Sequence, residues 1–194
     1  MGVANLLTGL RLLAAPAFAF WMARGDTRSA AIAAALIVVA IASDLLDGPL
    51  ARRMGAASAF GRAFDHTTDF VFISAGLCAG ALRGAFPWLL PLFIAIAFGQ
   101  YVVDSYWLHR ERELRMSALG RLNGTLYFFP LCGDLLSRLG VFSLLGLQIL
   151  EPAVLWLAWS LVATTLLSIV DRALALTREG LDSLDARTTD QSPR

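Results

Sequence analysis

The chain has little of what a soluble protein presents to water. Only 16% of its 194 residues are charged, against about 25% in an average soluble domain. It contains no lysine, because all 16 basic residues are arginine. Hydrophobic residues make up 57% of the chain, above the roughly 45–50% of a typical globular protein. This balance predicts a protein embedded in lipid, with room for about five or six spans.

The sequence also lacks a basic excess and a cysteine framework. The formal net charge is only +1, which leaves no surplus of positive charge to displace counterions from a nucleic-acid backbone. We therefore expect no nucleic-acid partner. Cys78 and Cys132 both lie in apolar stretches, where cysteine usually acts as a small buried hydrophobe. Any chemistry must then come from charged groups placed locally.

Six apolar stretches predict six transmembrane helices. They run from Leu6 to Ala23, Ser29 to Asp47, Phe64 to Leu82, Phe86 to Tyr106, Leu119 to Leu136 and Pro152 to Val170. Asp134 interrupts the fifth, and residues 141–150 are expected either to extend it or to form a re-entrant loop. The expected fold is an all-α integral membrane bundle of six helices. It forms one domain over residues 1–178, followed by a polar, disordered tail at 179–194.

The arginines set the expected orientation. With both termini in the cytoplasm, twelve arginines fall near the inner face, which the positive-inside rule favours. Four remain for the outer face: Arg24, Arg28, Arg83 and Arg138. The short segment from Ala4 to Arg11 is expected to lie along the inner interface, with Arg11 reaching toward the headgroups. We therefore expect a multi-pass protein of the inner (cytoplasmic) membrane, with its active site on the cytoplasmic side.

Four of the eleven aspartates lie between Ser43 and Phe70. Asp44 and Asp47 are three residues apart, and Asp65 and Asp69 are four apart, so each pair shares one face of its helix. Two helices joined by a short loop are antiparallel neighbours, which lets the pairs face each other at one depth. Carboxylates in a membrane are costly and repel one another. Two Mg²⁺ or Mn²⁺ ions, which prefer oxygen ligands, remove both problems.

Two other interpretations of this stretch are open. Arg52, Arg53 and Arg62 can neutralise the aspartates without any ion being bound, but such pairing does not require glycines at fixed positions. Gly48 and Gly61 stand beside the acidic groups and allow a ligand or a helix to approach the backbone closely. An ion- or proton-coupled transporter also keeps aspartates inside a helix bundle. It has no need for Gly48 or for an arginine that can grip a diphosphate.

The same stretch resembles the signature of the CDP-alcohol phosphotransferases, D-x2-D-G-x2-A-R-x8-G-x3-D-x3-D. The match holds at every fixed position: Asp44, Asp47, Gly48, Ala51, Arg52, Gly61, Asp65 and Asp69. Asn5, Thr8 and Arg11 are similar to an N-terminal N-x2-T-x2-R element found in many members. The signature covers residues 44–69, and the six-helix pattern extends the resemblance over most of the chain.

The resemblance implies a chemistry and a set of roles. The implied metal ligands are Asp44, Asp47, Asp65 and Asp69, of which Asp69 is also the candidate base. The implied nucleotide contacts are Gly48, Ala51 and Arg52, and Gly61 is a packing position. The implied reaction displaces CMP from CDP-diacylglycerol, or a similar CDP-linked lipid donor, by a small alcohol. Membrane lipids and a second copy of the chain are the other implied partners. A prenyl-transferring membrane enzyme is an alternative, because it also uses Mg²⁺ bound by aspartates. Such an enzyme would release diphosphate and not CMP.

The acceptor alcohol is not fixed by the signature. Relatives use glycerol 3-phosphate, inositol phosphate, inositol, serine or choline. A phosphorylated acceptor calls for arginines, and Arg121 and Arg172 are the candidates, although positive-inside topology explains the same residues. Asp104 is a further candidate, either as an acceptor contact or as a counter-charge. Arg121 and Asn123 stand where some glycerophosphate-using members carry lysines, which weakens an assignment to phosphatidylglycerophosphate synthesis.

Overall fold

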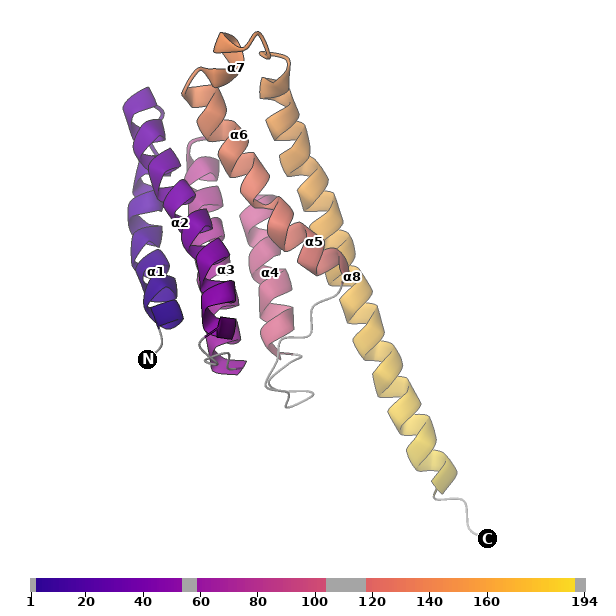
Figure 1. Ribbon diagram of the computed structural model, residues 1–194. Helices are drawn as coiled ribbons and strands as arrows, with labels where there is room; N and C mark the ends of the chain where they lie inside the picture. Colours follow the sequence, from indigo (N-terminus) through magenta and orange to yellow (C-terminus); the bar gives the residue numbers. More distant parts are fainter. Residues whose placement is uncertain (1–2, 54–58, 104–117, 191–194) are drawn as a thin grey trace.

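The computed structural model describes residues 3–53, 59–103 and 118–190, and within these ranges all regular structure is helical. Figure 1 shows long, roughly aligned helices with a short cap where α6 leads into α8. The helices are α1 (Val3–Met22), α2 (Thr27–Arg53), α3 (Ala59–Leu82), α4 (Leu89–Val103), α5 (Ala118–Leu126), α6 (Phe128–Arg138), α7 (Val141–Leu144) and α8 (Leu150–Asp190). The expected all-α fold is confirmed.

The fifth apolar stretch is divided into two helices. The break falls at Tyr127, between α5 and α6. Pro130 explains it, because a proline has no N–H to donate to the carbonyl four residues earlier, and its ring crowds that carbonyl. Gly140 then ends α6 with a φ of 72°, so the segment after it forms the separate short helix α7 and does not extend the fifth helix.

Both ends of the chain differ from expectation. Val3–Met22 is one helix, so the segment expected along the interface forms the first turns of α1. Its polar residues do not lie outside, because Thr8 and Arg11 are buried on one face of α1. At the other end α8 continues to Asp190, into the segment predicted to be a disordered tail. No proline follows Pro152 to stop this helix before Asp190.

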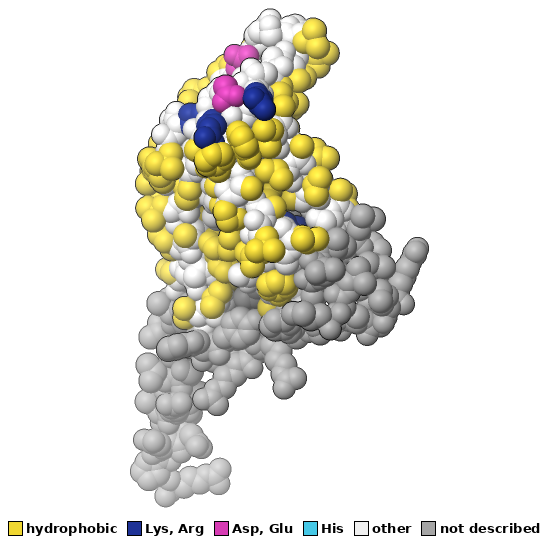
Figure 2. Space-filling model, turned by 90° about the vertical axis from the view of Figure 1, so that its left-hand side faces the viewer, with side chains coloured by type: hydrophobic (Ala, Val, Ile, Leu, Met, Phe, Trp, Pro, Cys, Tyr) yellow, Lys and Arg dark blue, Asp and Glu magenta, His cyan; other side chains and the backbone are white. Residues whose placement is uncertain are grey.

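The outer faces of the helices are apolar. Leu13 is 77% exposed and Trp156 is 73% exposed. Figure 2 shows hydrophobic side chains over much of the described surface, with most of the visible charged side chains toward one end. By length and composition, one helix in the described ranges can cross a membrane, over Leu150–Ala175 of α8. The apolar helical segments Thr8–Met22, Thr27–Ser43 and Leu89–Val103 are shorter, so six spans stay a prediction.

α1 packs closely along α3, and the two helices run in the same direction (Figure 1). The rings of Phe18 and Phe72 stack with centroids 4.4 Å apart. Arg11 precedes Phe18 by seven residues, or about two turns, and Asp65 precedes Phe72 by the same interval. The constant interval keeps the helices in one register, so the aromatic stack places Arg11 beside Asp65.

Gly76 makes this close approach possible. A Cβ atom at Gly76 would lie 2.3 Å from Cε1 of Phe18 and 3.1 Å from Cδ2 of Leu131. Phe18 is fully buried and stacked on Phe72, so its ring has no space into which to move. A side chain at position 76 would therefore push α1 away from α3.

We expect Gly76→Ala to destabilise the protein by about 1–3 kcal/mol, the usual cost of overpacking a core. The measurement is the melting temperature of the purified protein in detergent. Gly99→Ala is the matched control, because a Cβ at Gly99 meets nothing within 4 Å. Adding Phe18→Leu to Gly76→Ala should recover part of the loss. Equal melting temperatures for Gly76→Ala and Gly99→Ala would contradict the packing argument.

The end of the bundle away from Arg11 is held by charged groups. Both oxygens of the Asp134 carboxylate accept hydrogen bonds from Nη2 of Arg83, each at 2.6 Å. Asp26 caps α2, because its carboxylate accepts hydrogen bonds from the backbone N–H and the hydroxyl of Ser29 at 2.9 and 2.6 Å. These hydrogen bonds lower the pKa of Asp26. Three of the four arginines expected on the outer face, Arg24, Arg83 and Arg138, meet at this end.

Candidate active site

One cationic side chain joins two of the predicted metal ligands. Nη1 of Arg11, on α1, donates a hydrogen bond to Oδ1 of Asp65 at 3.3 Å and a shorter one to Oδ1 of Asp69, both on α3. The Arg11 side chain is only 2% exposed, whereas those of Asp65 and Asp69 are 32% and 25% exposed. The two carboxylates therefore converge on one buried positive charge and remain open to solvent on another side.

The position of Arg11 corrects the expectation that its side chain reaches toward the headgroups. A buried guanidinium is stable only with a negative partner, and Asp65 and Asp69 supply that charge. Sequence reasoning did not find this contact, although a signal was present. Thr8 and Arg11 are three residues apart and share a face of α1, and two polar residues on one buried face call for a polar partner.

The side chains of the predicted site residues on α2 lie outside the described part of the structure. Asp44, Asp47, Gly48, Ala51 and Arg52 all belong to the last turns of this helix, and the structure describes their backbone but not their side chains. α2 and α3 are antiparallel, and the end of α2 lies at the same end of the bundle as the start of α3 (Figure 1). The two acidic pairs are thus carried by the same end of the molecule, and the meeting of all four carboxylates stays a prediction.

The other predicted site residues are spread over three elements. Gly61 lies in the first turn of α3. Arg121 belongs to α5, but its side chain lies outside the described part, as does Asp104 altogether. The guanidinium of Arg172, on α8, lies 4.3 Å from the ring centroid of Tyr101, on α4. Arg172 is therefore the only one of the proposed acceptor contacts whose side-chain position is described.

The arrangement of Asp65 and Asp69 fits a shared cation. Their Oδ1 atoms both approach a single cationic nitrogen, so one ion of similar position can contact both. Carboxylate oxygens are the ligands that Mg²⁺ and Mn²⁺ prefer. Among the described residues there is no group of three or more histidine, cysteine or acidic side chains able to hold a metal. The other two predicted ligands, Asp44 and Asp47, have side chains outside the described part.

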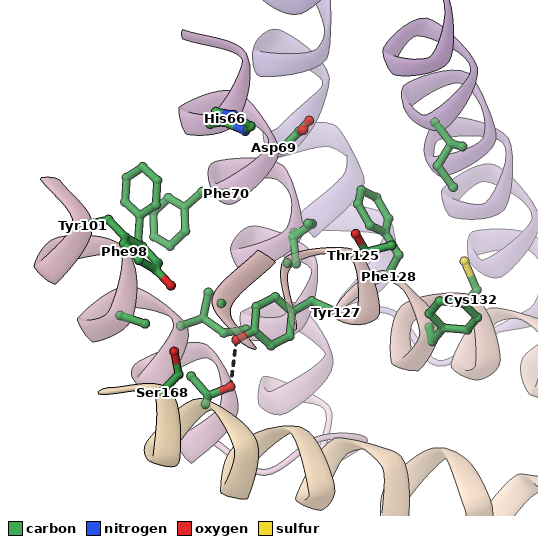
Figure 3. Close-up of a pocket in the computed structure, with 18 of the residues that line it drawn as sticks. His66, Asp69, Phe70, Phe98, Tyr101, Thr125, Tyr127, Phe128, Cys132 and Ser168 are labelled. Carbon is green, nitrogen blue, oxygen red and sulfur yellow. Dashed lines mark hydrogen bonds between the residues drawn. The ribbon is translucent and has the colours of Figure 1, made fainter. Parts of the chain in front are cut away.

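A cavity of about 690 Å³ opens beside Asp69. It lies between α3, α4, α8 and the α5–α6 pair, with Ile41 and Leu45 of α2 also on its wall. Figure 3 shows His66 and Asp69 close together at one edge, and the rings of Phe70, Phe98 and Tyr127 farther in. The wall is mostly apolar. A long hydrocarbon group fits this lining, with a polar reacting group at the Asp69 edge.

A few polar groups interrupt the apolar wall. Tyr127 and Thr165 share a hydrogen bond between their hydroxyl oxygens at 2.7 Å, drawn as the dashed line in Figure 3. Ser168 also lines the cavity, one turn before Arg172. The break between α5 and α6 places Tyr127 on the cavity wall, and His66 lies beside Asp69 on the same wall. The sequence pattern predicted neither position.

Comparison with known proteins agrees with this site. A profile of the CDP-alcohol phosphatidyltransferase family matches residues 1–170. Proteins named "Probable phosphatidylglycerophosphate synthase", from two strains of Mycobacterium tuberculosis, CDC 1551 and H37Rv, are 34% identical to the chain over 95 residues. The match covers 47% of this chain and 46% of each relative, so the chain spans about half the length of the curated relatives it matches. No solved structure matches.

The family match covers both helices that carry the acidic signature, and it also includes Arg11 and the residues that line the cavity. It therefore spans the candidate site except Arg172, which lies just beyond the matched range. With its signature complete and most of its length matched, this chain belongs to the CDP-alcohol phosphatidyltransferase family.

Proposed function

We propose that this chain transfers a phosphatidyl, or similar substituted phosphate, group from a CDP-linked donor such as CDP-diacylglycerol to an alcohol, releasing CMP. The product would be a phospholipid or its precursor. The observation that carries the proposal is the convergence of Asp65 and Asp69 on one cation, within a complete family signature. The cavity that begins at Asp69 supports a substrate with a polar head and a hydrocarbon part.

In this proposal the signature residues divide the work. Asp44, Asp47, Asp65 and Asp69 would hold two Mg²⁺ or Mn²⁺ ions, which when bound polarise the diphosphate and stabilise the departing phosphate of CMP. Gly48 and Ala51 would leave room for the nucleotide, and Arg52 would donate hydrogen bonds to the diphosphate. Gly61 would allow close packing at the start of α3.

The proposed reaction is a displacement at the lipid phosphorus. Asp69 would accept the proton of the acceptor hydroxyl, while the hydroxyl oxygen forms a bond to the lipid phosphorus. The bond from the phosphorus to the bridging oxygen of the diphosphate would break, and CMP would leave with its electron pair. The position of Asp69 at the edge of the cavity supports this role, because it faces the space where donor and acceptor can meet.

We propose glycerol 3-phosphate as the first acceptor to test, on the strength of the name carried by the mycobacterial relatives. A phosphorylated acceptor needs a cation near the cavity. Arg172 supports this choice, since it lies against Tyr101, whose ring lines the cavity. Arg121 and Asp104 remain proposed acceptor contacts.

The proposed setting is the cytoplasmic membrane. We propose a multi-pass protein with both termini and the site on the cytoplasmic side, which the apolar outer faces of the helices and the arginine distribution support. A homodimer is proposed from the family resemblance.

The test is CMP release by the purified protein with CDP-diacylglycerol and Mg²⁺, using a panel of acceptors. We expect release that depends on glycerol 3-phosphate, and a lipid product whose mass corresponds to phosphatidylglycerophosphate. Release driven by another alcohol of the panel would keep the reaction and change the acceptor. No CMP with any acceptor would refute the proposal, and release of diphosphate would favour prenyl transfer.

A further inference from the structure

A cationic nitrogen stands in the place where a bound ion is expected. Nη1 of Arg11 contacts Oδ1 of Asp65 and Oδ1 of Asp69. The two carboxylates are four residues apart on α3 and present these oxygens to the same point. A divalent ion that bridges the same two oxygens would need the space that Nη1 fills.

Arg11 is held in this place by the packing of its helix. The stack of Phe18 on Phe72 and the close contact at Gly76 fix α1 against α3 about two turns away. The backbone at Arg11 therefore has little freedom to withdraw. Removing Nη1 from the carboxylates requires a rotation of the arginine side chain, which is long and has several rotatable bonds.

We propose that Arg11 is a positioning residue that keeps Asp65 and Asp69 together in the metal-free protein and leaves their oxygens when a divalent ion binds. This inference rests on the proposed function, which supplies the ion. Arg11 places a positive charge between the two carboxylates and offsets their mutual repulsion. With Arg11 in place, the ion must compete against an internal positive charge. Arg11 therefore holds the two carboxylates in place before the metal binds, and it lowers the affinity of the site for the metal.

The test compares Mn²⁺ binding to the full-length wild type, Arg11→Met and Arg11→Lys, measured from the electron paramagnetic resonance signal of free Mn²⁺. We expect Arg11→Met to bind about tenfold more tightly, because a unit charge in contact with the ligands is removed. Arg11→Lys keeps the charge and should stay near wild type. Arg28→Gln removes an exposed arginine at the far end of the bundle and should also leave the affinity unchanged.

Thermal unfolding gives a second readout that does not depend on activity. We expect metal-free Arg11→Met to melt below wild type, and saturating Mn²⁺ to narrow the difference. A third measurement needs no variant at all. If Arg11 leaves the carboxylates, adding Mn²⁺ to wild type should increase the modification of Arg11 by phenylglyoxal, read by peptide mass spectrometry.

The outcomes separate this inference from the proposed function. Equal or weaker Mn²⁺ binding by Arg11→Met, or unchanged protection of Arg11 on adding Mn²⁺, would overturn the inference and leave the proposed metal site intact. Mn²⁺ binding together with the absence of CMP release would refute the proposed reaction and leave the inference standing. A wild type that binds no Mn²⁺ would remove the inference and the proposed metal ligands together.

Discussion

Asp65→Asn should abolish CMP release, reducing the rate by at least about a thousandfold, because metal-assisted stabilisation of a leaving group contributes several kcal/mol. The substitution keeps the size of the side chain and removes the charge that a divalent ion requires. We expect the same result for Asp44→Asn and Asp47→Asn. The measurement is CMP release with CDP-diacylglycerol, Mg²⁺ and the acceptor found in the panel.

Asp69→Asn is expected to behave differently from the other three variants. If Asp69 accepts the proton of the acceptor hydroxyl, its loss should stop transfer and leave donor and metal binding partly intact. His66→Ala is the matched control, because His66 lines the same edge of the cavity and has no proposed part in the chemistry. We expect a mild effect from this control. Full activity in Asp44→Asn, Asp47→Asn or Asp65→Asn would remove the metal assignment.

The ion pair at Arg11 bears on the alternative in which arginines neutralise the aspartates and no ion binds. One arginine does meet two aspartates, but it comes from α1 and is not one of the three first considered, Arg52, Arg53 and Arg62. The contact with Arg11 is compatible with a divalent ion and does not by itself require one. The side chains of Arg52, Arg53 and Arg62 lie outside the described part of the structure.

The sequence predicted the parts of the structure that depend on local pattern. The apolar stretches located most of the helices, although not the division between α5 and α6 or the length of α8. The fixed spacing of Asp65 and Asp69 predicted that they share a face, as the contact with Arg11 confirms. The sequence did not reveal the partner of Arg11. That contact joins residues 54 positions apart, and it depends on the register between α1 and α3.

The register itself depends on packing that a single sequence does not display. Phe18 and Gly76 look like ordinary members of two apolar stretches, and only their meeting shows that one fills the space the other leaves. The cavity has the same origin, because its wall combines residues of six helices. The six membrane spans stay a prediction for a different reason. Three of the apolar helical segments fall short of a full span, and the ends of several helices adjoin residues outside the described ranges.

The ion cluster at the far end of the bundle fixes three helices and a turn relative to one another. Arg83, at the end of α3, binds the Asp134 carboxylate of α6, and its Nε donates a hydrogen bond to the carbonyl of Met22 at 3.3 Å. Nη1 of Arg138 lies 3.5 Å from the same carboxylate, while its Nη2 donates hydrogen bonds to the carbonyls of Arg24 and Asp26. Asp134 is thus the negative charge shared by two arginines.

We expect Asp134→Asn to destabilise the protein by about 3–5 kcal/mol, the usual result of removing one partner from a buried ion pair. The side chains of Arg138 and Asp134 are only 7% and 10% exposed, so solvent cannot replace the lost charge. Two neighbouring guanidinium groups would then repel each other. The measurement is thermal unfolding in detergent, with Glu151→Gln as the control, because it removes an exposed carboxylate at the same end.

The same variant tests whether the far end controls the site. If the cluster fixes where α3 ends against α1, loosening it should also disturb the register that brings Arg11 to Asp65. Replacing Asp134 with leucine and Arg83 with methionine together should recover stability, since an apolar pair of similar size often substitutes for a buried ion pair. Equal melting temperatures for Asp134→Asn and the Glu151→Gln control would show that the cluster contributes little to stability. The register would then depend on the α1–α3 contact alone.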